Sequence, residues 1–218
     1  MSERVAVLLA DDDELTRTGL RALLSDEPDI DVVGEAADGA EVLGLVRELR
    51  PDVVLMDVRM PLLDGIAATR LLRSALADPP KVVVITTFGH DEYVYEALRA
   101  GAAGFLLKRS KAAQIAHALR LVAAGDTVLF PAAVRTMAAR RPPLPQGPGA
   151  VELTEREADV LRLMAAGLSN AEIAERAYVT IETVKTHVGN VLAKLGAANR
   201  THAVVIAYES GFVNPGEG

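Results

Sequence analysis

Short apolar runs alternate with helix-length amphipathic segments five times within the first 125 residues, and this alternation constrains the fold more than any other feature. The apolar runs predict strands at Val5–Ala10, Asp31–Ala36, Val53–Asp57, Val82–Thr86 and Phe105–Leu107. The segments between and after them predict helices over 14–25, 40–50, 66–74, 92–100 and 111–124. Strands that alternate with helices form a parallel sheet with helices on both faces. The sequence therefore predicts an α/β fold, a (βα)5 doubly wound parallel sheet.

The last third of the chain shows a different pattern and is predicted to be helical. Residues 140–149 are rich in proline and have the composition of an exposed linker, because proline and glycine interrupt helices and strands. Beyond them we expect helices over 155–166, 170–177, 181–195 and 201–210. Their expected N-terminal caps are Thr154 with Glu157, Ser169 with Glu172, Thr180 and Thr201. A short helix, a tight turn and a longer helix predict a helix-turn-helix.

The predicted organisation is an α/β domain over 1–125, a linker over 126–150 and a small all-α helix-turn-helix domain over 151–213. The absence of cysteine excludes disulfides and thiolate metal sites. We find no signal peptide and no apolar run of about 18 residues, so we expect a cytoplasmic protein without membrane contact. The net charge of -7 argues against a nucleic-acid partner, but most of the acidic residues lie in the first domain.

Polar side chains stand where the predicted strands end. Asp11 and Asp12 follow the first strand, Asp57 ends the third, and Thr86 and Lys108 lie at the ends of the last two. The carboxyl ends of parallel strands share one edge of the sheet, so these groups should meet there. Carboxylates brought together repel unless a cation lies among them, and their oxygens favour Mg²⁺.

A carboxylate beside such a cation can attack phosphorus and form an acyl phosphate. Lys108 and Thr86 would then bind the oxygens of the transferred group. The alternative is a purely structural role, in which residues 11–13 and Thr86 cap helices and Lys108 forms an ordinary salt bridge.

Motifs in both domains resemble those of one class of proteins. In the first domain they are Asp11-Asp12, Leu55-Met56-Asp57, Met60-Pro61, Asp64-Gly65, Thr86 and Gly104–Lys108, which resemble the receiver domain of two-component response regulators. In 151–213 they are Leu153–Glu157, Glu172–Ala174, Thr183–His187 and Lys194-Leu195, which resemble the LuxR-type helix-turn-helix domain. Together they resemble the NarL/FixJ class of response regulators over nearly the whole chain. The resemblance implies a flavodoxin-like receiver followed by a DNA-binding domain.

The resemblance also implies the roles of the residues at the sheet edge. Asp57 would accept a phosphoryl group from a sensor histidine kinase, and Asp11, Asp12 and Asp57 would hold Mg²⁺. Lys108 would contact the phosphoryl group, while Thr86 and Phe105 would form the conformational relay.

Two features depart from the usual receiver pattern. Phe105 stands where receivers often carry tyrosine, so its side chain can turn but cannot donate a hydrogen bond. Asp13-Glu14 stands where many members of the class carry His-Pro, which adds two acids near the site.

In the second domain, the resemblance implies a transcription regulator that binds a double-stranded DNA operator, as a homodimer when phosphorylated or DNA-bound. The second helix of a helix-turn-helix lies in the major groove. Lys185 and Thr186 match base-contacting positions on that helix. The expected phosphate contacts are Thr180, Lys194, Arg200 and Thr201. Gly189 is a departure, because a polar or basic side chain is common at that position.

Three alternatives remain open from the sequence. Residues 151–213 could be a helical interaction module that does not bind DNA. The first domain could be a magnesium-dependent phosphatase with Asp57 as nucleophile, although such enzymes carry a second acid where Arg59 stands. A nucleotide-binding α/β domain is disfavoured because no glycine-rich phosphate loop follows the first strand.

Overall fold

The chain forms two compact units, residues 1–128 and 129–218. A computed structural model describes residues 4–87, 91–124 and 152–213. The predicted linker, 126–150, lies outside the described residues, so the domain boundaries at 125 and 150 stay predictions. Among the described residues, no helix combines the length and the apolar character needed to cross a bilayer.

A parallel five-stranded sheet forms the centre of the first unit, and its strand order is β2-β1-β3-β4-β5. Its strands are β1 (Val5–Ala10), β2 (Ile30–Ala36), β3 (Val53–Asp57), β4 (Lys81–Thr86) and β5 (Gly104–Leu107). The predicted α/β fold is confirmed, and each predicted strand is present with bounds that differ by at most one residue.

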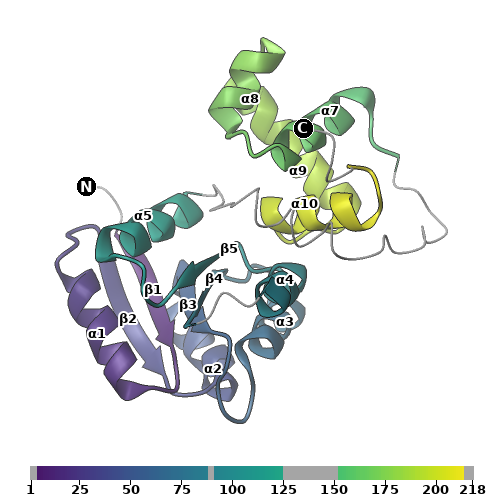
Figure 1. Cartoon of the computed structure of the whole chain (residues 1–218). Coiled ribbons are helices and arrows are strands. Elements are labelled where there is room, and N and C mark those ends of the chain that lie inside the picture. Colours follow the sequence, from purple (N-terminus) through teal and green to yellow (C-terminus); the bar gives the residue numbers. More distant parts are fainter. Residues whose placement is uncertain (1–3, 88–90, 125–151, 214–218) are drawn as a thin grey trace. The chain divides into compact units, whose positions relative to one another are not determined.

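Helices cover both faces of this sheet (Figure 1). They are α1 (Glu14–Ser25), α2 (Gly39–Leu49), α3 (Gly65–Ala75), α4 (Asp91–Ala100) and α5 (Ala112–Ala123). Helices α1 and α5 pack together on one face, while α2, α3 and α4 form a row on the other. This layering buries both faces of the strands and leaves their carboxyl ends free to form a site.

The strand residues alternate between two apolar layers. Val7, Leu9, Leu55 and Ile85 point toward α1 and α5, where they pack against residues such as Leu119. Each fully buried aliphatic side chain of this kind stabilises the fold by about 1.5–3 kcal/mol. The alternation also decides which face each polar residue at a strand end occupies, because residues two apart share a face.

Two glycines allow the chain to pass close to the end of β3. A Cβ atom on Gly65 would lie 1.9 Å from the Asp57 carbonyl oxygen, and one on Gly39 would lie 2.1 Å from the Leu63 carbonyl oxygen. No side chain fits at either position without moving the backbone. The loop after β3 is therefore held against α2 and the start of α3, and this fixes the surroundings of Asp57.

The described part of the second unit is helical. It contains α7 (Glu155–Ala165), α8 (Asn170–Ala177), α9 (Ile181–Leu195) and α10 (Arg200–Glu209). Both predicted capping boxes form, and Thr180 caps α9 as expected. The expected cap of the last helix was wrong. Asn199 caps α10 by accepting a hydrogen bond from the His202 amide, and Thr201 lies inside the helix and is buried.

Candidate functional site

The structure brings the three predicted acids together at the carboxyl end of the sheet. Asp11 and Asp57 are buried and Asp12 is exposed. One carboxylate oxygen from each lies within 4.8 Å of the others. Asp57 ends β3 at the centre of the sheet, and Asp11 follows the neighbouring strand β1. The parallel pairing of these strands is what aligns their ends.

Lys108 reaches the same place from the end of β5. Its Nζ lies 2.6 Å from Oδ2 of Asp11 and 3.1 Å from Oδ2 of Asp57. Burial raises the pKa of Asp57 above its ordinary value, although hydrogen bonding to Lys108 acts in the opposite direction. Burial alone would lower the pKa of Lys108, but its close interactions with the two carboxylates outweigh burial and raise it. The lysine therefore stays charged between two acids.

The oxygen atoms of this cluster suit a hard cation. Oδ1 of Asp11 accepts a hydrogen bond from the Asp13 amide, and Oδ1 of Asp57 accepts one from the Val58 amide. Oδ2 of Asp11 is buried and, among the described residues, accepts no hydrogen bond of good geometry, although its distance to Lys108 is that of an ion pair. A buried oxygen in this situation has a lone pair available for a metal. The cluster could hold one ion, with exposed Asp12 on the solvent side.

A network of three charged residues that sequence reasoning missed, Arg17, Glu35 and Arg21, is connected to the backbone of Asp11. Arg17 donates a hydrogen bond of 2.6 Å to the Asp11 carbonyl oxygen and also pairs with Glu35. Arg21 binds the same Glu35 carboxylate, and these two arginines lower its pKa, with Arg21 the larger cause. The sequence carries no local signal for this network, because Glu35 lies at the end of β2 and meets α1 only in the folded chain.

Asp13 has a structural role. Its side chain caps α1 by accepting a hydrogen bond from the Leu15 amide and another of 2.5 Å from the Thr16 hydroxyl. The Thr16 bond is the main cause of the lowered pKa of Asp13. The predicted alternative of a helix cap is thus confirmed for Asp13, while Asp11 points into the cluster.

Thr86 and Phe105 lie on the neighbouring strands β4 and β5. Thr86 ends β4 and is buried, and Phe105 on β5 is half-buried. Phe105 pairs with Val84, two residues before Thr86, so the two side chains share a face and are diagonal neighbours. The backbone amide of Lys108 also donates to the Thr86 carbonyl oxygen at 2.9 Å. A movement of the loop that follows Thr86 would therefore displace both Phe105 and Lys108.

In the second unit, Lys185 and Thr186 lie on the exposed side of α9. The Lys185 ammonium pairs with Glu182 at 2.9 Å, and the Thr186 hydroxyl donates to the Glu182 carbonyl oxygen. Val184 and Val191 on the opposite side are buried. Gly189 continues the exposed side, and a Cβ atom there would meet no other atom within 4 Å. The helix is therefore amphipathic, with its polar side available to a partner.

Three of the four expected phosphate contacts interact within the second unit or are buried in it, namely Lys194, Arg200 and Thr201. Lys194 pairs with Glu157 at 2.6 Å and donates to the Glu152 carbonyl oxygen. Arg200 is 7% exposed and donates to the Leu168 carbonyl oxygen and to Oδ1 of Asn170, while Thr201 is 1% exposed. Buried groups of this kind have little surface for DNA, so the structure offers Arg200 and Thr201 no route to a phosphate in this conformation.

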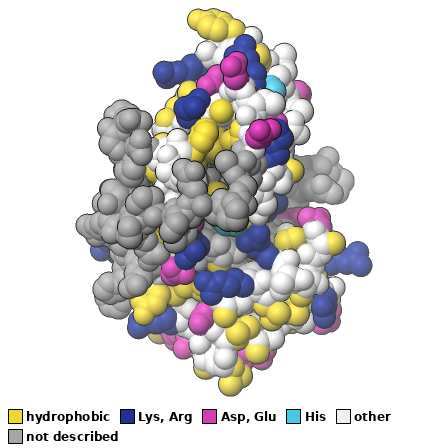
Figure 2. Space-filling view, turned by 90° about the vertical axis from the view of Figure 1, so that its right-hand side faces the viewer, with side chains coloured by type: hydrophobic (Ala, Val, Ile, Leu, Met, Phe, Trp, Pro, Cys, Tyr) yellow, Lys and Arg dark blue, Asp and Glu magenta, His cyan; other side chains and the backbone are white. Residues whose placement is uncertain are grey.

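Basic and acidic side chains both occur on the face of the molecule shown in Figure 2. Figure 2 shows basic and acidic side chains interspersed over the face in view, rather than one continuous basic area.

Comparisons with known proteins identify the class. Residues 7–120 match the family model of the response regulator receiver domain, and residues 151–207 match that of the luxR family of bacterial regulatory proteins. The chain belongs to the two-component response regulators that carry a LuxR-type DNA-binding domain. This membership confirms the predicted fold and the predicted class of transcription regulator, and it decides against the phosphatase and interaction-module alternatives.

Full-length relatives agree with this assignment. The chain is 45% identical over 213 residues to the transcriptional regulatory protein LiaR of Bacillus subtilis, covering 96% of this chain and 100% of LiaR. It is 41% identical over 212 residues to the response regulator VraR of Staphylococcus aureus, covering 96% and 99% of the two chains. Among solved structures, the response regulator ChrA of a heme-sensing two-component system is 33% identical with a TM-score of 0.54, and the match covers 98% of this chain and all of ChrA.

Proposed function

We propose that Asp57 is the phosphoryl acceptor of this regulator and that a sensor histidine kinase is the donor. The observation that carries the proposal is the position of Asp57, which is buried at the centre of the sheet edge beside Asp11 and the Lys108 ammonium. Oδ2 of Asp57 faces the lysine, and this oxygen would attack phosphorus. A bond from that oxygen to phosphorus forms, the bond from phosphorus to the donor's histidine nitrogen breaks, and the nitrogen retains the electron pair.

Mg²⁺ is the cofactor that the donor set favours, held by Asp11, Asp12 and Asp57. When bound, it would neutralise the negative charge that otherwise keeps an anionic donor away from two carboxylates. Lys108 holds the remaining charge of the transferred group, since its ammonium already lies within hydrogen-bonding distance of Asp57.

The effect of phosphorylation would be transmitted to the DNA-binding domain by a change in the surface of the receiver domain. A phosphoryl group adds about -1.5 to -2 charges at the sheet edge. The Thr86 hydroxyl would donate to a phosphoryl oxygen and draw the loop after β4 inward, which gives Phe105 room to turn toward the core. This change would reshape the surface of α4 and α5, pair two receivers as a homodimer and raise affinity for an operator with two half-sites through effective concentration.

DNA recognition would follow the helix-turn-helix geometry, with α9 in the major groove of the operator. Lys185 and Thr186 would contact base edges, and Thr180, at the N-terminus of α9, would contact a phosphate. Lys194 pairs with Glu157, but its side chain is 37% exposed, and its ammonium could add a phosphate contact. Such a regulator acts where the DNA is, so we expect it in the cytoplasm.

Acetyl phosphate and intact mass measurement test the phosphoacceptor. The protein should gain one phosphoryl group in Mg²⁺ and none in EDTA, and Asp57→Ala should gain none. An adduct that forms equally in EDTA, or that survives Asp57→Ala, would exclude Asp57 as the acceptor. Asp52→Ala is a matched control, because Asp52 lies at the opposite end of the β3 strand and its carboxylate accepts a hydrogen bond from the Ala6 amide, away from the acidic cluster.

A further inference from the structure

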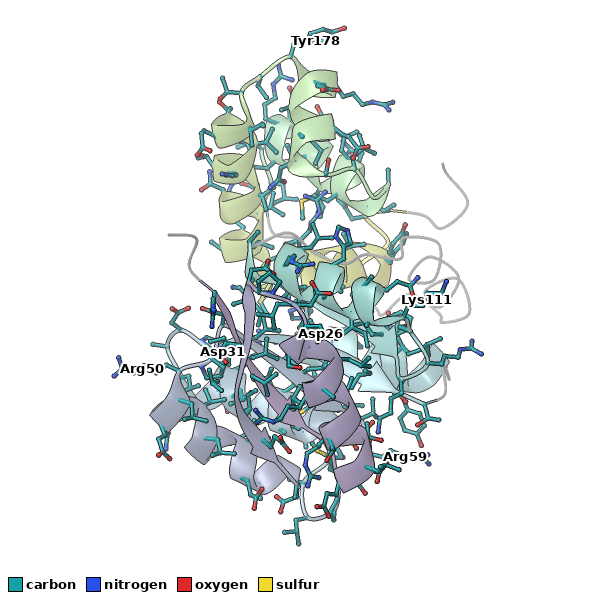
Figure 3. All side chains as sticks on the ribbon, turned by 90° about the vertical axis from the view of Figure 1, so that its left-hand side faces the viewer. Asp26, Asp31, Arg50, Arg59, Lys111 and Tyr178 are labelled. Carbon is teal, nitrogen blue, oxygen red and sulfur yellow. The ribbon has the colours of Figure 1, made fainter. Side chains whose placement is uncertain are left out.

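Tyr178 occupies the turn between α8 and α9 in an unusual way. Its backbone is left-handed, with φ 55° and ψ 43°, and its residue surface is 96% exposed. Figure 3 shows its side chain at the end of the second unit, pointing away from the helices. Glycine suits a left-handed turn position best, and an exposed aromatic ring gains nothing from burial. The free protein therefore offers no stabilising reason for tyrosine at this position.

The neighbours of Tyr178 are the residues expected to meet DNA. Thr180, two residues on, caps α9 with its hydroxyl, and Lys185 lies one turn into that helix. The axis from Ile181 to Lys185 is about 6 Å long at the usual helical rise. A base edge in the major groove lies about 6 Å, half a groove width, from a flanking phosphate. A side chain just before α9 can thus reach the DNA backbone when Lys185 reaches a base.

The chemistry of tyrosine fits this position. Its hydroxyl can donate to a phosphate oxygen, and its ring can pack on the adjacent sugar. The charges around the turn are balanced, since the acids Glu175 and Glu182 are accompanied by Arg176 and Lys185. Glu182 and Lys185 already form an ion pair. A phenol is a neutral donor, so it can add a phosphate contact without changing this balance of charges.

We propose that Tyr178 is a DNA-backbone contact outside the recognition helix, donating its hydroxyl to a phosphate beside the bases that Lys185 reads. The proposal rests on the proposed DNA binding of α9. It assigns Tyr178 to affinity and register rather than to base selection. It also explains why the turn keeps a left-handed tyrosine where glycine would be less strained.

The test uses the full chain, activated with beryllofluoride and Mg²⁺, and two labelled duplexes of unrelated sequence at low salt. Tyr178→Phe removes the hydroxyl alone and should weaken binding about threefold, and Tyr178→Gly should weaken it about tenfold. Both losses should be equal on the two duplexes and leave the salt dependence unchanged, because tyrosine is neutral. Lys185→Ala removes a base contact and should instead reduce the difference in affinity between the two duplexes.

Leu62→Gly is the matched control. Leu62 is also apolar, 88% exposed and at a positive φ of 59°, but it lies in the first unit. Both glycine variants should melt at the same temperature as the parent or higher, since each relieves a left-handed residue. Only Tyr178→Gly should lose affinity for DNA.

Each other outcome overturns a defined part of the account. If Lys185→Ala weakens binding and both Tyr178 variants bind DNA as the parent does, Tyr178 does not contact DNA. If the losses differ between the duplexes, Tyr178 reads bases rather than the backbone. If the parent protein binds neither duplex, the proposed DNA binding itself fails.

Discussion

Replacing Lys108 with methionine removes the one ammonium that the described structure places between Asp11 and Asp57, while keeping a side chain of similar length. The lysine side chain is 17% exposed, and those of Asp11 and Asp57 are 2% and 10% exposed. The variant leaves two largely buried carboxylates facing each other without a counter-charge. We expect Lys108→Met to destabilise the first unit strongly when no divalent cation is present.

The magnitude follows from the distances. Carboxylate oxygens of the two acids lie within 4.8 Å, and two unit charges at that distance repel by about 3.5 kcal/mol at an effective dielectric constant of about 20. Removing one partner of a buried ion pair costs about 3–5 kcal/mol. One carboxyl group can escape part of this cost by taking up a proton, so we expect a loss of about 3 kcal/mol at neutral pH.

Mg²⁺ should reverse much of this loss, because it supplies the missing positive charge. A ligand at a hundred times its Kd stabilises the folded state by about 2.7 kcal/mol. The parent protein should gain less, since there the cation must share the carboxylates with Lys108.

Urea-dependent hydrogen exchange, read on peptides from β1 and β3, measures the unfolding free energy of the first unit within the full chain. Lys81→Met is the control, because Lys81 begins β4 at the opposite end of the sheet. If Lys108→Met loses less than about 0.5 kcal/mol in EDTA, the range of ordinary surface substitutions, the ion cluster does not hold the sheet edge together as described.

Three further predictions concern the second unit, and the same exchange measurement checks each of them. Arg200→Ala should lower the unfolding free energy of this unit by about 2–3 kcal/mol, because the part-buried Leu168 carbonyl oxygen and Oδ1 of Asn170 lose their charged donor; an unchanged value would show that these two bonds do not stabilise the unit. Gly189→Ala should raise the unfolding free energy of the second unit by about 0.5–1 kcal/mol, because the added methyl group would meet no other atom within 4 Å. Gly19→Ala in α1 is the control, since it should stabilise the first unit for the same reason. A loss of stability at Gly189 would show a contact that the structure lacks. Lys194 and the Thr154 amide lower the pKa of Glu157 to about 2, so its stabilising effect should be complete above about pH 4.5 and disappear as the pH falls toward 2. Glu157→Gln should remove this dependence, and a parent protein that is equally stable over that range would contradict it.

Much of the fold could be predicted because the signals are local. Parallel strands buried on both faces produce continuous apolar runs such as Val53–Asp57, and the capping boxes at Thr154 and Ser169 mark helix starts through side chains three residues apart. The last helix shows where local signals become ambiguous. Asn199 and Thr201 can both cap, and a shift of one residue in the start of α10 decided that Thr201 is buried.

The site was predictable where topology alone brings residues together. Asp11, Asp57 and Lys108 meet because they end parallel strands, and the family resemblance named the same residues. Long-range pairings carry no such signal. Arg17 with Glu35 and Lys194 with Glu157 join elements whose contact depends on packing, so the sequence indicated Lys194 only as a phosphate contact and did not predict its ion pair.

The central claim is that Asp57 controls DNA binding by accepting a phosphoryl group. Its most direct test is the affinity of the full chain for a duplex selected from a random pool, measured with and without beryllofluoride in Mg²⁺, for the parent protein and for Asp57→Asn. We predict that beryllofluoride raises the affinity of the parent protein for this duplex and leaves the affinity of Asp57→Asn unchanged. An equal response in both proteins, or no response in the parent, would contradict it.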